Sequence, residues 1–128
     1  MKLSITAAMA TLRAAAVAGL GINCRGSGLC PSDGAAGNLL NLKAIVDNIQ
    51  PRSRHYAPGQ QIACTGSLCV FYQNGASGTA EQTSGFMQAL LNHGCKKCGS
   101  CPTQPGNDVS KGQLTVNIVG HPQCQGQC

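Results

Sequence analysis

The sequence has very few large aromatic side chains: it contains no Trp, two Tyr and two Phe in 128 residues. A small chain with so few aromatic rings buries too little apolar surface to be held by a hydrophobic core alone. What it has instead is nine cysteines, all of them after residue 23. They make up roughly 8% of the chain beyond residue 18, a level typical of disulfide scaffolds. We therefore expect oxidised cysteine pairs to supply much of the stability.

The sequence also lacks an apolar run long enough to cross a membrane, which would need about twenty uninterrupted residues. Its N-terminal apolar stretch is split by Arg13 and diluted by Thr and Ser. Lys2, followed by small apolar residues that end in Ala-Val-Ala at 16–18, is typical of a secretory signal with its peptidase site. The sequence therefore predicts a signal peptide over residues 1–18, a secreted domain over residues 19–128 and no stable membrane insertion.

Clustered positive charge is missing as well. Beyond residue 18 the chain has seven basic and four acidic residues, a net charge of +3, and the basic residues are scattered among Gly and Ser. Proteins that bind nucleic acid through charge cluster their Lys and Arg on one face. We therefore predict no nucleic-acid partner.

Groups that could catalyse a reaction do not converge in the sequence. The titratable candidates are His55, His93, His121, Asp33, Asp47, Glu81 and Asp108. His93 falls in the last turn of a predicted helix, where a cation is favoured, and Asp108 falls in a turn, where Asp commonly bonds its own backbone. These structural roles predict that the protein is not an enzyme. The enzymatic alternative is a basic, ribonuclease-like hydrolase that uses His93 or His121 as general acid or base with Glu81.

Three cysteines, Cys95, Cys98 and Cys101, have the CxxCxxC spacing of zinc and iron–sulfur sites. Because a secreted chain meets an oxidising compartment, disulfides are favoured over metal ligation there, and we predict no metal and no cofactor. Nine is an odd number, so at least one thiol stays free or pairs with another molecule. We expect a monomer, with a disulfide-linked dimer as the alternative.

Two segments of the chain have helical periodicity. The first starts at Asn38, a good N-cap residue, and ends before Pro51; the second starts at a capping box formed by Thr79 and Gln82 and ends at His93. Short strand-like runs cover residues 62–64, 68–73 and 114–118. Helices with one apolar face need a sheet to cover, so the sequence predicts one α+β domain built as a two-layer sandwich.

Several sequence blocks resemble a known family. They are GINCRG at 21–26 with Cys30, LLNHGC at 90–95 with Cys98, and GNDVS followed by KGQLTVN at 106–117. In this order they resemble the virally encoded killer toxin of smut fungi and its fungal and plant relatives, over nearly all of the secreted domain. The resemblance implies an antiparallel sheet of about five short strands, with two antiparallel helices on one face.

The resemblance also implies three disulfides. They join Cys24 to Cys95, Cys30 to Cys98, and Cys64 to Cys124. Cys69, Cys101 and Cys128 are then additional to the family pattern, and two of these three could pair.

The function implied by the resemblance is inhibition of competing fungal or plant cells by blocking voltage-gated calcium channels from outside. Basic side chains on a rigid surface can approach the acidic residues that ring cation pores. The family toxin has its key basic residue two positions before the central cysteine, where this chain has Ile62. The candidate contacts with a target-cell surface protein are therefore other basic residues: Arg25, Arg52, Arg54, Lys96, Lys97 and Lys111. The alternative is a secreted interaction effector without channel activity.

Overall fold

The computed structural model describes residues 20–30 and 38–128. The predicted signal peptide, residues 1–18, and Asp33 lie outside the described residues. The elements, in chain order, are α2 (Leu39–Asp47), β1 (His55–Tyr56), β2 (Ala63–Thr65), β3 (Leu68–Gln73), β4 (Gly78–Thr79), α3 (Ala80–Asn92), β5 (Gly99–Pro102), the 3₁₀ helix η1 (Val109–Lys111), β6 (Gln113–Ile118) and β7 (Gly126–Gln127).

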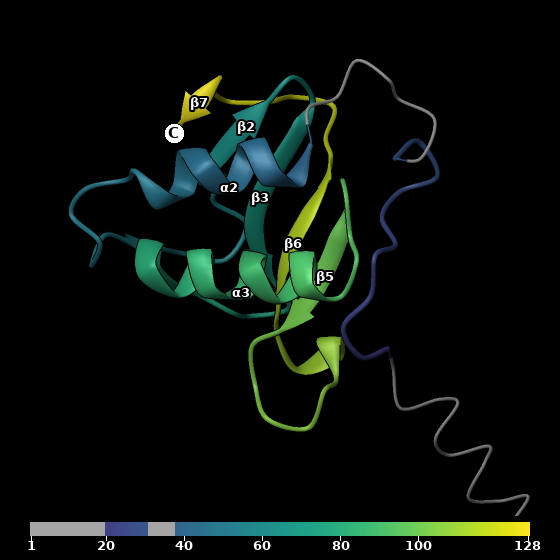
Figure 1. Ribbon diagram of the computed structural model, residues 1–128. Helices are drawn as coiled ribbons and strands as arrows, with labels where there is room; N and C mark the ends of the chain where they lie inside the picture. Colours follow the sequence, from purple (N-terminus) through teal and green to yellow (C-terminus); the bar gives the residue numbers. More distant parts are fainter. Residues whose placement is uncertain (1–19, 31–37) are drawn as a thin grey trace, which may run out of the picture.

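A five-stranded antiparallel sheet, in the order β5-β6-β3-β2-β7, forms one layer of the protein. Helices α2 and α3 run antiparallel to each other across one face of it (Figure 1). Helix α2 packs over β2 and β7, and α3 packs over β5 and β6. The predicted two-layer α+β sandwich is confirmed.

Helix α2 begins where the sequence predicted. The Asn38 side chain accepts a hydrogen bond from the backbone N–H of Asn41 at 2.8 Å, so one of the free N–H groups of the first turn is satisfied. The helix ends at Asp47, several residues before Pro51, because the next two N–H groups bond carbonyls only three residues back. Ile49 still faces the core and is fully buried, which explains why the apolar period extends past the helix end.

Arg52 joins the end of α2 to the start of α3. Its guanidinium nitrogens donate to the backbone carbonyls of Val46, Ile49 and Ala80, to Ser84 Oγ and to the Glu81 carboxylate. The bonds to the Val46 carbonyl and to Ser84 Oγ are both 2.6 Å long. Val46 lies in the last turn of α2, where carbonyls have no N–H partner four residues on, and Ala80 and Ser84 lie in the first half of α3. This one side chain therefore links the two helices.

We expect Arg52→Ala to lower the free energy of unfolding by about 3 kcal/mol, since hydrogen bonds from a charged donor are worth about 1.5–3 kcal/mol each and partly buried carbonyls lose their partner. Urea denaturation followed by circular dichroism measures the loss. Arg54→Ala is the matched control, because the Arg54 guanidinium lies 5.2 Å from the Tyr56 ring centroid and donates a long, 3.5 Å bond to the Cys128 carbonyl. That control should cost less than about 1 kcal/mol. Equal losses in the two variants would contradict the assigned role of Arg52.

Helix α3 has the predicted capping box. Thr79 Oγ1 accepts from the Gln82 N–H at 3.1 Å, and Gln82 Oε1 accepts from the Thr79 N–H at 2.9 Å. His93 is the C-cap, and Gly94 follows with a φ of 97°, the left-handed conformation that favours glycine after a helix. The buried side of the helix consists of Ala80, Thr83, Met87 and Leu90.

The central strands of the sheet were predicted, and the edge strands were not. β3 pairs with β6 over its whole length, from Leu68 opposite Ile118 to Gln73 opposite Gln113. The residues of β5 and β7 lie outside the strand-like runs that the sequence predicted. The pair β1–β4, also outside those runs, forms a separate two-stranded sheet. Pairing with a neighbouring strand, not side-chain pattern, makes these segments strands.

Candidate target-binding site

The N-terminal arm, residues 20–30, lies against the open edge of β5. Asn23 and Ser100 exchange two backbone hydrogen bonds, of 3.0 and 2.8 Å, so the arm adds an isolated bridge to the sheet. Further along the arm, the Ser27 N–H donates to Asn117 Oδ1 at 2.9 Å. Gly26 makes this approach possible, because a Cβ there would lie 2.6 Å from the Cys98 Cβ. The arm therefore has a defined path over the end of the sheet.

Two disulfides tie the arm to the loop that follows α3. Cys24 bonds Cys95 and Cys30 bonds Cys98, the pairs that the resemblance implied. Their Cα–Cα distances are 5.1 and 6.3 Å, within the usual range for disulfides. The bonded cysteines are 71 and 68 residues apart in the sequence, so the two bonds join the N-terminal arm to a segment that lies beyond both helices. We call this region, residues 24–30 together with 94–98, the stapled end.

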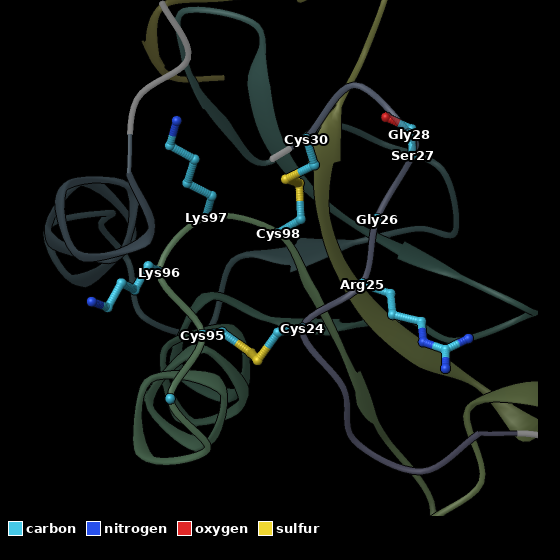
Figure 2. Close-up of a pocket in the computed structure, with 11 residues that line it drawn as sticks. Cys24, Arg25, Gly26, Ser27, Gly28, Cys30, Cys95, Lys96, Lys97 and Cys98 are labelled. Carbon is cyan, nitrogen blue, oxygen red and sulfur yellow. A yellow bond between two sulfur atoms is a disulfide. The ribbon is translucent and has the colours of Figure 1, made fainter. Parts of the chain in front are cut away.

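A cavity of about 570 Å³ lies between the two segments of the stapled end, the N-terminal arm and the loop after α3. Its walls are the two disulfides and the small residues of the arm, and its basic side chains are Arg25, Lys96 and Lys97. Figure 2 shows Arg25 projecting from the arm and the two lysines projecting from the facing loop, with the disulfides between them. Within the described part of the chain, no acidic residue lines this cavity.

A second hollow continues the first. It has a volume of about 330 Å³ and is lined by Asn38, Leu40 and Leu91, sharing Cys95 and Lys96 with the larger cavity. Leu40 is 65% exposed, although it is a large apolar residue. The stapled end and the hollow beside it thus form an apolar surface with cationic side chains around it, an arrangement suited to an acidic partner that also has apolar surface.

The structure divides the predicted contact residues into groups. Arg25, Lys96 and Lys97 come together at the stapled end. Neither Arg25 nor Lys96 belongs to the ion pairs found among residues 20–30 and 38–128, which are Lys43–Asp47 and Arg52–Glu81.

The other predicted contacts lie elsewhere. Arg52 uses its guanidinium inside the protein, and Arg54 lies over the ring of Tyr56. Lys111 is the last residue of η1 and does not line the cavity. Which of these side chains contacts a target stays a prediction.

The implied disulfide between Cys64 and Cys124 is wrong for this chain. Cys64 bonds Cys69, its direct register partner across the β2–β3 hairpin, and Cys124 bonds Cys128. Two cysteines that lie directly opposite each other in a hairpin have their sulfurs close enough to bond, with no contribution from another strand or helix. The tight turn at Gly66 sets that register. The short spacing of Cys64 and Cys69 around this turn is a signal in the sequence that the pairing implied by the resemblance does not use.

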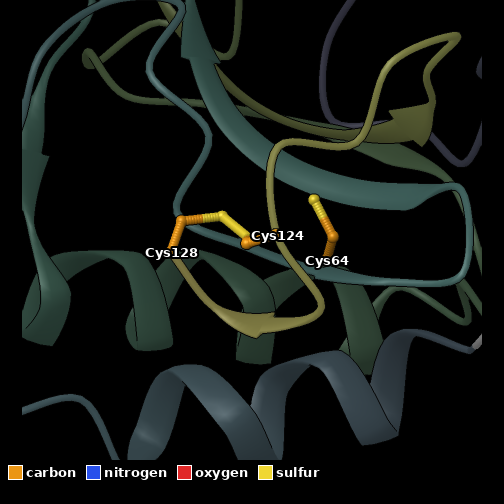
Figure 3. Close-up of side chains that lie close together, drawn as sticks. All are labelled: Cys64, Cys124 and Cys128. Carbon is orange, nitrogen blue, oxygen red and sulfur yellow. A yellow bond between two sulfur atoms is a disulfide. The ribbon is translucent and has the colours of Figure 1, made fainter.

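The sulfurs of Cys64, Cys124 and Cys128 lie within 4.8 Å of one another (Figure 3). All three belong to disulfides, and a disulfide sulfur has no thiolate to offer a metal ion. The CxxCxxC run is divided in the same way, since Cys95 and Cys98 are also bonded.

Cys101 is the cysteine left without a disulfide partner. It lies on β5, is 6% exposed, and burial raises the pKa of its thiol. A neutral, buried thiol is a poor nucleophile and does not reach the surface. The odd cysteine that allowed a disulfide-linked dimer is therefore an interior residue, and the oligomeric state stays a prediction.

Glu81 and His93, two groups of the hydrolase alternative, lie apart. Glu81 is in the first turn of α3 and His93 caps its other end, which places them about 18 Å apart along the helix axis. Glu81 is also engaged with Arg52 at 3.0 Å. The structure does not bring this predicted acid–base pair together.

Fold and surface together define a class of protein: a small, disulfide-stapled α+β domain that presents a rigid basic end. The described residues contain no helix that is both long and apolar enough to span a membrane. A family model, Kp4, matches residues 6–120 of the chain. The chain is also 40% identical over 107 residues to the KP4 killer toxin of Ustilago maydis P4 virus, covering 78% of this chain and 80% of that protein. The chain belongs to the Kp4 killer-toxin family.

Proposed function

We propose that this protein is secreted and inhibits the growth of competing fungal or plant cells by blocking a voltage-gated calcium channel. The observation that carries the proposal is the stapled end, where three basic side chains and an apolar hollow are held together by two disulfides. The relative that is 40% identical is named a killer toxin, which supports a role in growth inhibition.

The stapled end is suited to binding because its backbone is already fixed. A partner that binds a flexible loop must order it, whereas the two disulfides have ordered this one before contact. Cationic side chains on such a surface can approach the acidic groups that surround the entrance of a cation channel. Opposite charge also accelerates the encounter.

Ile62 is a further reason to assign target contact to the stapled end. It occupies the position where the family toxin has its key basic residue, it is fully buried, and its N–H bonds the Val70 carbonyl at 2.9 Å. A buried isoleucine does not contact a partner. If the channel-blocking function persists in this chain, its charge comes from elsewhere on the surface.

A growth assay with the purified, oxidised protein tests the proposal. We expect inhibition of sensitive fungal or plant cells, and relief of that inhibition when calcium is added, because a higher external concentration restores calcium entry through partly blocked channels. The same concentration of magnesium is the control and should give less relief. Inhibition that calcium leaves unchanged would contradict channel block and favour a secreted effector that binds another surface partner.

A further inference from the structure

A separate cavity, of about 240 Å³, lies on a part of the protein that the growth-inhibition proposal does not use. It lies where the turn between β3 and β4, the first half of α3 and the residues after β5 meet. The residues that line it are Gly75, Ala76, Ser77, Gln82, Phe86, Thr103 and Gln104. None of them is charged, and none lines the stapled end. This cavity therefore differs from the cavity at the stapled end in both chemistry and location.

The amide of Gln82 is held in one orientation. Its Oε1 accepts the Thr79 N–H at 2.9 Å as part of the capping box of α3. This bond identifies the carbonyl side of the amide, which leaves the Nε2 group as the donor for a ligand. A donor fixed before binding loses little freedom when a ligand arrives.

Thr103 contributes a hydroxyl whose hydrogen-bonding capacity is unused. Thr103 Oγ1 is buried and has no hydrogen-bond partner among the described residues, although the Thr103 N–H bonds the Gly112 carbonyl at 3.0 Å. Gly112 leaves room for this hydroxyl, since a Cβ there would lie 2.6 Å from Oγ1. Buried hydroxyls are nearly always hydrogen-bonded, so an unpaired one beside a cavity points to a polar ligand.

Phe86 adds an aromatic surface to the lining of this cavity. Its ring meets Tyr72 edge to face, with centroids 6.3 Å apart and planes at 85°. The Tyr72 hydroxyl is itself 2.8 Å from Thr83 Oγ1, within hydrogen-bond distance, so the ring that supports Phe86 is fixed to α3. The cavity thus combines a held aromatic ring with oriented amide and hydroxyl groups.

We propose that this cavity binds a single neutral sugar ring, such as the terminal hexose of a cell-surface glycan. A sugar has hydroxyls around its rim, which match amides and hydroxyls, and C–H groups on its faces, which match an aromatic ring. The absence of charge among the lining residues disfavours ionic ligands, and their polarity disfavours lipids. The volume is below the roughly 300–1,000 Å³ of pockets for drug-sized ligands, which fits one ring.

Such a site would hold the protein at the target-cell surface while the stapled end reaches its partner. Two contacts on one rigid body reinforce each other through effective concentration, even when the sugar contact is weak alone. The inference goes beyond the proposed function and does not depend on the identity of the partner.

Nuclear magnetic resonance of the ¹⁵N-labelled protein, titrated with glucose, mannose and N-acetylglucosamine, tests the site. We expect saturable shifts for at least one sugar at the Ser77 and Gln104 backbone amides and the Gln82 and Gln104 side chains. Gln104→Ala and Ser77→Ala, both at exposed positions, should each weaken binding at least tenfold. Gln88→Ala is the control on α3, because the Gln88 amide bonds Asn92 and does not line the cavity. No shifts with any sugar, or equal binding by all variants, would overturn the proposal.

A cell assay separates this inference from the proposed function. Gln104→Ala should inhibit intact, walled cells less than the unmodified protein does, and should inhibit wall-free protoplasts equally. Equal potency of the two proteins on walled cells would overturn the docking role. Growth inhibition without sugar binding would overturn only the sugar site, and sugar binding without growth inhibition would overturn only the proposed function.

Discussion

Replacing Cys24, Cys95, Cys30 and Cys98 together by serine is expected to lower the free energy of unfolding by about 7 kcal/mol. The reason is the length of the loops: the two bonds span 71 and 68 residues, so the unfolded chain gains much freedom when both are gone. Small domains are stable by only about 5–15 kcal/mol in total. We therefore expect most of the variant to be unfolded at 37 °C, as measured by urea denaturation and circular dichroism.

Each single removal should cost slightly less than half of that loss. With either disulfide intact, the other closes only a short additional ring through residues 24–30 and 95–98, worth about 3 kcal/mol. Whichever of the two bonds is present already removes most of the freedom of the long loop in the unfolded chain. Removing the Cys124–Cys128 bond, whose ends are 4 residues apart, is the short-loop control and should cost about 2 kcal/mol. A quadruple-variant loss equal to the sum of the two single removals would contradict this coupling.

The elements that the sequence predicted well are those whose signals are local. Asn38 and the Thr79–Gln82 capping box fixed the helix starts, because an N-cap acts within its own turn. The alternation from Leu114 to Ile118 marked β6; Leu114 and Val116 are fully buried in the core, although Thr115 between them is buried as well. These signals need no knowledge of the rest of the chain.

What could not be predicted depends on pairing between distant segments. β5 is a strand because β6 and the arm lie on either side of it, and its own residues carry no strand pattern. The Cys64–Cys69 bond depends on the register of the β2–β3 hairpin, whereas the family resemblance implied that Cys64 pairs with Cys124. Arg52 looked like a surface cation until its partners on α2 and α3 were known.

The same distinction applies to the candidate site. The basic residues Arg25, Lys96 and Lys97 were predicted individually as target contacts, from the sequence blocks around them. Their meeting at one cavity is a consequence of the two long-range disulfides. The exposed Leu40 and the hollow beside it carried no sequence signal, since the residue fits the apolar period of α2.

Reversing the charge of the stapled end is the second change with a large expected effect. We expect Arg25→Glu with Lys96→Glu to raise the concentration needed for growth inhibition at least 100-fold. Two attractive contacts with an acidic partner become repulsive, and charged contacts at the centre of an interface are often worth 2 kcal/mol or more, about 30-fold each. Slower association contributes to the loss, and the difference from the unmodified protein should shrink at high salt.

Lys43→Glu is the matched control for Lys96→Glu, because it makes the same change of charge on the same residue type at a position outside the cavity. It disrupts the 2.9 Å pair with Asp47, an i,i+4 pair of helix α2 with partly exposed side chains; such pairs are worth less than about 1 kcal/mol, so the fold should persist. We expect Lys96→Glu alone to lose about 30-fold in potency and Lys43→Glu to stay within about twofold, with unchanged circular dichroism for both. Equal losses would mean that net charge, and not the stapled end, determines inhibition. Full potency of the double variant would place the target contact on another face of the protein.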